Sequence, residues 1–156
     1  MAVPQFGEPD AGRTYPDRPA VFGLVLNAGK IAVVRVEVAG MAPWWDLPGG
    51  GIEAGESEAQ ALVREFGEEA GLLVSPNARF ASADQYFFKS DGAPFNNRGH
   101  FWTVELVRAA PELQIEPEHS LVWVDAPSAI AMLRHDAHAW AVASWMRCVA
   151  PGDVNR

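Results

Sequence analysis

The sequence predicts a single α/β domain in which a mixed β-sheet is covered by helices on both faces. The chain has 156 residues, of which 49% are hydrophobic and 21% are charged, and this size and balance suit one domain with a single core. Short apolar segments rich in β-branched and aromatic residues predict strands. Amphipathic segments that begin at polar capping residues predict helices. Because the helical segments are interspersed among the strands, we expect helices on both faces of the sheet.

The predicted domain occupies residues 19–150. Residues 1–18 are polar and rich in proline and glycine, which predicts a flexible N-terminal arm. Residues 151–156 are predicted to form a short C-terminal tail. The sequence contains neither an internal repeat nor a low-complexity segment, which agrees with one domain.

The first predicted elements form a β-hairpin. Residues 20–27 and 31–38 are apolar and rich in β-branched side chains, which is typical of strands. The glycine-containing segment 27–30 between them is a turn signal. Residues 39–48 are then expected to form a loop that carries two tryptophans.

Residues 57–70 form the clearest predicted helix. Ser57 and Gln60 have the spacing of a capping box, in which each side chain satisfies a free backbone N–H at the start of the helix. Gly71 is a good residue to end the helix. One face should pack on the sheet, because its apolar residues recur at helical spacing. These residues are Ala59, Leu62, Phe66 and Ala70.

The remaining elements complete the predicted α/β/α arrangement. They are strands at 79–88, 99–107 and 120–124, a loop at 89–98, and helices at about 127–134 and 137–149.

Composition excludes several classes of protein. The formal net charge is −8, so a long nucleic acid is not an expected partner, although a small phosphate compound can bind through a bridging cation. Cys148 is the one cysteine, which rules out an internal disulfide. No segment has the length of a membrane span or the pattern of a signal peptide, so the expected location is the cytoplasm. Trp140 and Trp145 are expected to pack in the core or to form the face of a homodimer.

Three glutamates lie on one side of the 57–70 helix. Glu65, Glu68 and Glu69 are spaced i, i+3 and i+4, so their side chains project within one narrow arc. A solvated acidic face is one interpretation, since glutamate is mostly exposed. The alternative is a site for a hard divalent cation, because Mg²⁺ takes oxygen ligands and often combines carboxylates with substrate phosphates.

The surrounding residues favour the metal site. The segment from Gly50 to Leu72 resembles the signature of the Nudix hydrolase family, whose fixed glycine, glutamate and arginine positions all have matching residues here. These are Gly50, Glu56, Arg64, Glu65, Glu68, Glu69 and Gly71. Two departures are mild: Phe66 stands where the family more often has an aliphatic residue, and Gly67 lies inside the helix, where glycine costs about 1 kcal/mol relative to alanine.

The resemblance implies a Nudix fold, an α/β/α sandwich, and a Mg²⁺-dependent hydrolase in which Mn²⁺ is an alternative cofactor. The metal ligands it implies are Gly49 through its carbonyl and the carboxylates of Glu65, Glu68 and Glu69. It also implies an ion pair between Glu56 and Arg64 that holds the loop against the helix, which would support the ligands from behind. The expected catalytic residues are Glu56, Arg64, Glu68, Glu69 and Glu118.

The general base is less constrained, because family members take it either from the signature or from a later loop. Glu118 is the preferred candidate, and Glu116 or a glutamate of the signature remains an alternative.

The expected substrate is a nucleoside triphosphate or a nucleoside diphosphate derivative. Trp45 and Tyr86 offer aromatic faces on which a base can stack. Asp46 and Asn97 offer polar groups that could contact the base. A catalytically silent nucleotide-binding or sensor domain is the alternative function, and a plain acidic interaction domain is a third.

Two histidines near the C-terminus, His135 and His138, suggest a zinc site at first sight. Too few further ligands accompany them, so both are expected to be exposed.

Overall fold

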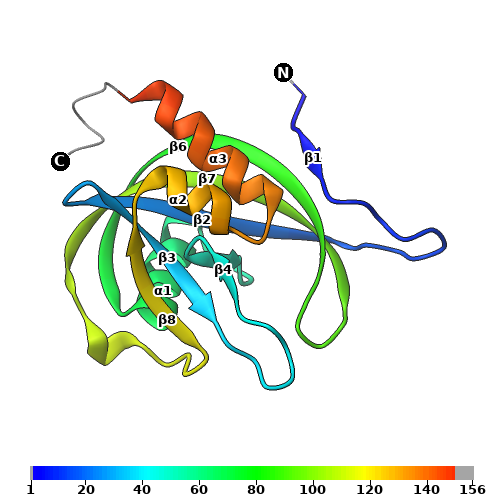
Figure 1. Ribbon diagram of the computed structural model, residues 1–156, viewed down its shortest axis with the longest axis horizontal. Coiled ribbons are helices and arrows are strands. Elements are labelled where there is room, and N and C mark those ends of the chain that lie inside the picture. Colours follow the sequence, from blue (N-terminus) through cyan, green and yellow to red (C-terminus); the bar gives the residue numbers. More distant parts are fainter. Residues whose placement is uncertain (1, 150–156) are drawn as a thin grey trace.

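The computed structural model describes residues 2–149, and the predicted C-terminal tail at 151–156 lies outside them. Strands and helices are interspersed along the chain (Figure 1). In chain order they are β1 (Gln5–Phe6), β2 (Asp17–Asn27), β3 (Lys30–Val36), β4 (Trp44–Asp46), β5 (Gly49–Gly51), α1 (Glu58–Ala70), β6 (Leu72–Phe88), β7 (Pro94–Ala109), the 3₁₀ helix η1 (Pro111–Leu113), β8 (His119–Val124), α2 (Ala126–Met132) and α3 (Asp136–Cys148).

The strands form one mixed, curled sheet in the order β1-β6-β7-β2-β3-β4, with β5 paired to β2 and β8 paired to β3. The long β6–β7 hairpin is antiparallel, whereas β2 runs parallel to β7. Helices α2 and α3 cover one face of the sheet and α1 covers the other (Figure 1). The predicted α/β/α sandwich is therefore confirmed.

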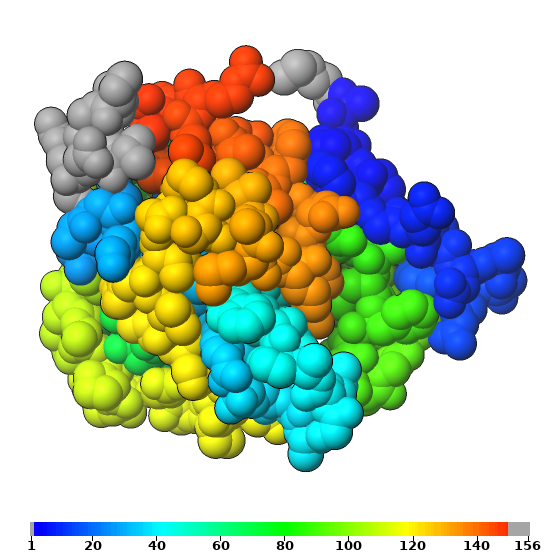
Figure 2. All heavy atoms as spheres, in the orientation of Figure 1, coloured from blue at the N-terminus to red at the C-terminus, as the bar shows by residue number. Residues whose placement is uncertain are grey.

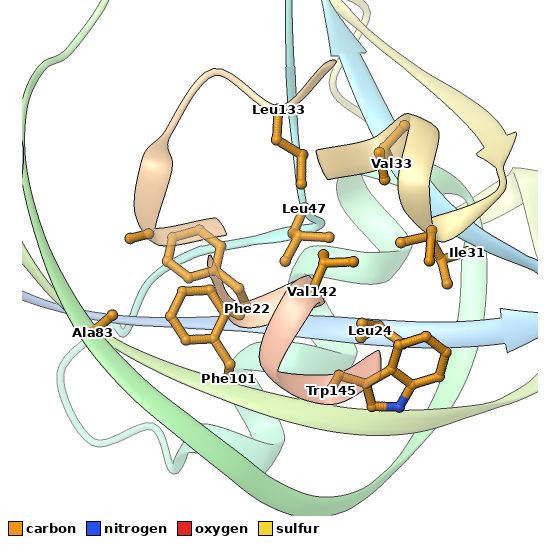
Figure 3. Packing of buried hydrophobic residues seen from close by; sticks show 14 of the residues in the cluster. Phe22, Leu24, Ile31, Val33, Leu47, Ala83, Phe101, Leu133, Val142 and Trp145 are labelled. Atoms are coloured by element: carbon orange, nitrogen blue, oxygen red, sulfur yellow. The ribbon is translucent and has the colours of Figure 1, made fainter. Parts of the chain in front are cut away.

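The central strand β2 is buried on both faces, and alternate residues enter different cores. Phe22 and Leu24 pack in the core beneath α2 and α3, whereas Val21 and Val25 pack in the core beneath α1. This alternation follows from the two-residue period of a strand. Figure 3 shows the first core, in which Trp145 of α3 packs near Leu24. Trp145 therefore belongs to the core, one of the two roles expected for it.

Helix α1 has the predicted ends and the predicted buried face. The Ser57 hydroxyl accepts the N–H of Gln60, the Gln60 side chain accepts the N–H of Ser57, and Gly71 adopts the left-handed conformation at φ 61°. Leu62 and Phe66 are fully buried. The helix is thus held rigidly on the sheet, which fixes the direction of its acidic side.

The two strands of the β6–β7 hairpin are longer than the strands that the sequence predicted at 79–88 and 99–107. Strand β6 begins at Leu72, directly after the helix, and the loop before β7 shortens to residues 89–93. Three register shifts interrupt the pairing of β6 with β7, and they break the alternation that identifies a strand in a sequence. The segment expected to be a loop at 39–48 contains β4, which pairs with β3.

The N-terminal segment contacts the domain. Gln5 and Phe6 pair with β6, and the Gln5 and Asn96 side-chain amides exchange two hydrogen bonds of 3.0 and 3.1 Å. Tyr15 packs edge-on against Tyr86 with ring centroids 5.2 Å apart. Within residues 2–149, no helix is both long and apolar enough to cross a membrane.

Candidate active site

A cleft of about 420 Å³ opens beside the C-terminal half of α1. Glu65 and Glu69 line one side of it, and Phe87 and His135 line another. The segments that border the cleft come from distant parts of the chain: the β3–β4 connection (cyan), the β6–β7 turn (green) and the start of α3 (orange) lie around it (Figure 2). The cleft therefore joins the acidic side of α1 to an aromatic region.

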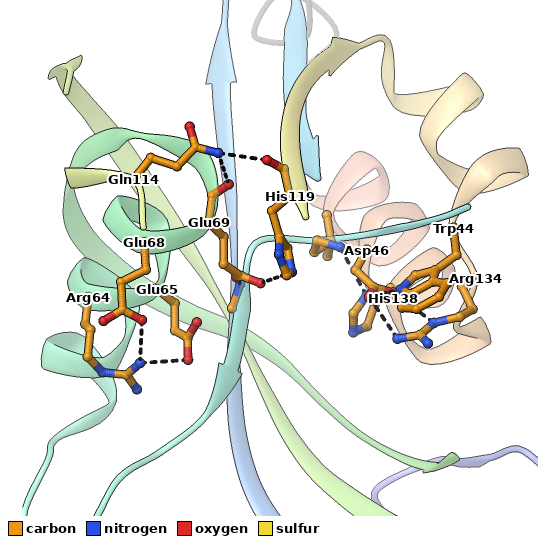
Figure 4. A network of polar contacts seen from close by, with 12 residues as sticks. Trp44, Asp46, Arg64, Glu65, Glu68, Glu69, Gln114, His119, Arg134 and His138 are labelled. Carbon is orange, nitrogen blue, oxygen red and sulfur yellow. Dashed lines mark hydrogen bonds and ion pairs between the residues drawn. The ribbon is translucent and has the colours of Figure 1, made fainter. Parts of the chain in front are cut away.

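Glu69 is a buried acidic residue of the site whose two carboxylate oxygens both have partners. It is 8% exposed, its Oε1 accepts the backbone N–H of Gly49 at 2.9 Å, and its Oε2 lies 3.0 Å from Nε2 of His119 (Figure 4). Burial raises the pKa of Glu69 to about 7, although the His119 contact opposes the shift. Both oxygens are thus held in fixed directions at the wall of the cleft.

Only glycine fits at position 49. Its φ is +144°, and a Cβ there would lie 2.2 Å from the carbonyl oxygen of Val21. The close approach lets the loop before α1 pair with β2 and direct the Gly49 N–H at Glu69. At Gly50 a Cβ would lie 2.8 Å from Glu65 Oε1, so the missing side chain leaves room for that carboxylate.

The expected ion pair between Glu56 and Arg64 is present. Arg64 Nε and Nη2 donate to the two oxygens of Glu56 at 2.7 and 2.9 Å, a bidentate geometry that fixes both groups. Nη2 also donates to the carbonyl of Gly51 at 3.2 Å. The hydrogen bond from Arg64 lowers the pKa of Glu56. Arg64 therefore ties the loop to the helix.

Arg64 also restrains two glutamates of the helix, Glu65 and Glu68. Its Nη1 donates to Glu65 at 2.9 Å and to Glu68 at 3.3 Å (Figure 4). Burial raises the pKa of Glu65, and the neighbouring Arg64 opposes that shift. Glu68 does not line the cleft, so of these two carboxylates only Glu65 both contacts Arg64 and reaches the cleft.

The carboxylates are not preassembled around a metal. Among the described residues, no group of three or more acidic, histidine or cysteine side chains is arranged to hold an ion as it stands. The donor chemistry does fit a hard divalent cation, because Glu65 and Glu69 bring carboxylate oxygens to the cleft beside the Gly49–Gly50 backbone. Glu68 could join them by turning away from the arginine.

The loop before β8 brings two more glutamates to the cleft. Glu116 and Glu118 both line it, and Glu118 is exposed. The carbonyl of Glu118 accepts the N–H of Glu37 at 2.9 Å, which anchors this end of the loop to β3. The structure thus brings both predicted base candidates to the same rim.

His119 is a site residue that the sequence did not reveal. Burial alone would lower its pKa, but the contact with Glu69 and the nearby Glu116 raise it overall. Its Nδ1 is buried and has no hydrogen-bond partner within the described part of the chain. No local pattern marks this residue, because β8 brings it to α1 only in the folded protein.

The two aromatic residues predicted to contact the substrate, Trp45 in β4 and Tyr86 in β6, are each wrong by one position. Trp45 packs towards the core and Tyr86 packs on Tyr15, whereas Trp44 and Phe87 line the cleft. Successive residues of a strand point to opposite faces, so an error of one position reverses the side chain.

The predicted polar contacts, Asp46 and Asn97, do line the cleft. Asp46 accepts hydrogen bonds from Arg134 at 2.9 and 3.3 Å and from the Trp44 indole at 3.1 Å, and burial raises its pKa. Asn97 accepts a hydrogen bond from Arg18 at 3.1 Å. Arg18, which the sequence did not single out, thus places a cation at the cleft within electrostatic reach of Glu65 and Glu69.

The expectation that His135 and His138 are exposed is wrong. They are 7% and 2% exposed, and His138 Nδ1 accepts the N–H of Leu47 at 3.2 Å. Burial lowers the pKa of His135 to about 3 and that of His138 well below its ordinary value. The pair is therefore neutral and belongs to the base of the cleft, where His135 packs edge-on against Phe87.

Comparison with known proteins agrees with the geometry of this site. A family model described as the NUDIX domain matches residues 16–146. The chain belongs to the NUDIX family. The segment from Gly50 to Leu72, with its glutamates on α1, is the NUDIX signature of this chain.

Two curated relatives match shorter stretches of the chain. A protein of Mycobacterium tuberculosis named putative 8-oxo-dGTP diphosphatase 2 is 43% identical over 56 residues, which is 35% of this chain and 40% of that protein. An RNA pyrophosphohydrolase of Brucella ovis is 42% identical over 66 residues, 38% of this chain and 37% of that protein. The chain thus matches about two fifths of the length of these relatives.

The structural match to a solved NUDIX hydrolase covers more of the chain than the sequence matches do. A NUDIX hydrolase from Nitrosomonas europaea superimposes with a TM-score of 0.71, covering 85% of this chain and 89% of that one at 20% identity. At this identity the likeness concerns the NUDIX fold alone.

Proposed function

We propose that this chain is a Mg²⁺-dependent pyrophosphohydrolase that cleaves the diphosphate linkage of a nucleoside triphosphate or a nucleoside diphosphate derivative. The observation that carries the proposal is the buried Glu69, held between the Gly49 N–H and His119 at the wall of the cleft. Such a constrained carboxylate with a raised pKa is typical of a functional site. The names of the two relatives, a diphosphatase and a pyrophosphohydrolase, support the same reaction class.

Glu65, Glu68, Glu69 and the Gly49 carbonyl are the groups that would hold the cation. When bound, Mg²⁺ would neutralise the diphosphate and make its phosphorus easier to attack. Arg64 and Glu56 keep the loop and α1 in register, so the carboxylates stay in place while substrate enters. Mn²⁺ has similar ligand preferences and would substitute.

We assign the general base to Glu118, with Glu116 as the second candidate. Both line the cleft, on the loop that is docked against the end of α1. The base would accept a proton from water as the water oxygen bonds to phosphorus. The bond between that phosphorus and the bridging oxygen breaks, and the remaining phosphate leaves with its electron pair. Such proton transfer contributes about 10²–10⁴ in rate.

The other end of the cleft suits a nucleoside. Phe87 offers a ring on which a base can stack, and neutral His135 and Asn97 offer hydrogen-bonding groups without charge. Arg18 lies between this region and the glutamates: it donates to Asn97 and is attracted by Glu65 and Glu69. We therefore place the base at Phe87 and the phosphate chain near Arg18.

A substrate panel tests the proposal against a silent sensor domain. The purified chain with Mg²⁺ is incubated with nucleoside triphosphates, nucleotide sugars and dinucleoside polyphosphates, and released phosphate, diphosphate and nucleoside monophosphate are measured. We expect turnover of at least one class, and its abolition by EDTA. Tight nucleotide binding without any release would instead identify a binding domain.

A further inference from the structure

The loop at residues 110–119 is docked onto the C-terminal turn of α1. The backbone N–H groups of Ile115 and Glu116 both donate to the carbonyl of Glu68 at 3.1 Å, and the N–H of Ala110 donates to the carbonyl of Gly71 at 2.7 Å. The last carbonyls of a helix have no partner within the helix. The loop supplies those partners, so its path is fixed by the same helical turn that carries the site glutamates.

Gly67 makes this docking close. A Cβ at position 67 would lie 3.2 Å from Cβ of Leu113 and 3.4 Å from its Cδ1. Glycine inside a helix costs about 1 kcal/mol relative to alanine, and here its small size lets Leu113 of η1 rest directly on α1. The contact with Leu113 thus explains why a glycine, which is a poor helix former, stands at position 67 within the signature.

Gln114 connects the helix to the far end of the loop. Its Nε2 donates to the carbonyl of Glu69 at 3.2 Å and to the carbonyl of His119 at 2.8 Å (Figure 4). A single side-chain amide therefore ties the backbone of the buried glutamate to the backbone of the histidine that contacts it. Gln114 itself does not line the cleft.

We infer that Gln114 is a positioning residue: its amide, with Gly67, sets the 110–119 loop so that His119 meets Glu69 and Glu116 faces the cleft. The inference deepens the proposed hydrolytic function and rests on it. Gln114 is exposed, yet its amide nitrogen donates to two backbone carbonyls, one on the helix and one at the start of β8. Displacement of a group near the chemistry by about 1 Å can cost on the order of 10² in rate.

The test compares kcat and KM of the parent, Gln114→Glu and Gln114→Ala. Glutamate has nearly the same shape but no N–H to donate, so the fold should persist while the loop is released. We expect kcat to fall about tenfold with KM within about twofold. Hydrogen exchange gives a readout that needs no turnover: the 110–119 amides should exchange faster in both variants.

Gly67→Ala provides a second variant, which disturbs the contact between the loop and the helix from the helix side. The new methyl group should push Leu113 outwards and lower kcat, yet the melting temperature should not fall, because alanine favours the helix. Ile115→Thr is the matched control, since its side chain is 67% exposed and its backbone N–H remains. It should resemble the parent in kcat and in exchange.

The outcomes separate the inference from the proposed function. An inactive parent would overturn the proposed hydrolysis. An active parent with unchanged kcat and unchanged exchange in Gln114→Glu would overturn the positioning role. A loss of kcat in Ile115→Thr equal to that in Gln114→Glu would also contradict it, because the effect would then not depend on the amide.

Discussion

Glu69→Gln is expected to reduce turnover by at least about 10²-fold without lowering the melting temperature. Glutamine keeps the shape of the side chain and an oxygen for the Gly49 N–H, so the packing at the end of α1 should persist. Burial already favours the neutral form of Glu69, whose pKa is about 7, and a neutral replacement therefore costs little stability. The chemistry loses a negative oxygen at the cleft wall, where the cation is expected.

Glu112→Gln is the matched control for this variant. Glu112 is an exposed glutamate whose carboxylate pairs with Arg108 at 2.7 Å, away from the cleft. Activity and melting temperature are measured for parent, Glu69→Gln and Glu112→Gln in parallel. If Glu69→Gln retained more than about a tenth of the parental rate, the role assigned to Glu69 would be wrong.

Acid should destabilise the protein below about pH 6.5, and His135 should account for a large share. The unfolded imidazole has a pKa of 6.5, whereas burial lowers the pKa in the folded protein to about 3. Above pH 6.5 both states are neutral and the group adds no pH dependence. Between pH 6.5 and about 3 only the unfolded chain takes up the proton, so the free energy of unfolding falls by about 1.4 kcal/mol per pH unit.

Urea unfolding at pH 7 and pH 4.5 measures this effect. His135 should contribute about 2.7 kcal/mol of the loss over that range, and His138, whose pKa is also lowered by burial, should add to it. His135→Gln cannot take up the proton and should lose correspondingly less stability than the parent. Equal losses in the two proteins would mean that His135 is protonated without unfolding.

The part of the site that the sequence predicted is the part carried by one helix. Glu65, Glu68 and Glu69 share a side of α1 because helical spacing places them there, and Ser57 and Gly71 mark the ends of that helix. These features depend on local chain geometry, which the sequence contains directly.

The residues that the sequence missed reach the cleft only through tertiary structure. His119 arrives with β8 and Arg18 with the start of β2, and neither has a local pattern that distinguishes it from a surface residue. The neighbours Trp44 and Trp45 illustrate a second limit. Their places depend on the register between β4 and β3, and three residues of strand give too short an alternation to set it.

The buried histidines show a third limit. His138 is paired with the Leu47 N–H and packed against Phe22, with ring centroids 4.3 Å apart. Each contact joins residues that are far apart in the chain. Composition and spacing could not reveal these contacts and therefore predicted that the two histidines are exposed.

The central claim is that the acidic side of α1 binds a divalent cation together with a nucleotide, and its most direct measurement is a thermal shift. Parent and Glu65→Gln are heated with Mg²⁺ and a non-hydrolysable nucleotide, and with Na⁺ at matched ionic strength. A ligand that binds only the folded state stabilises it by about 2.7 kcal/mol at a hundredfold excess over Kd. We predict a clear Mg²⁺-dependent rise for the parent and a smaller rise for Glu65→Gln. Equal shifts in the two proteins, or no difference between Mg²⁺ and Na⁺, would contradict the claim.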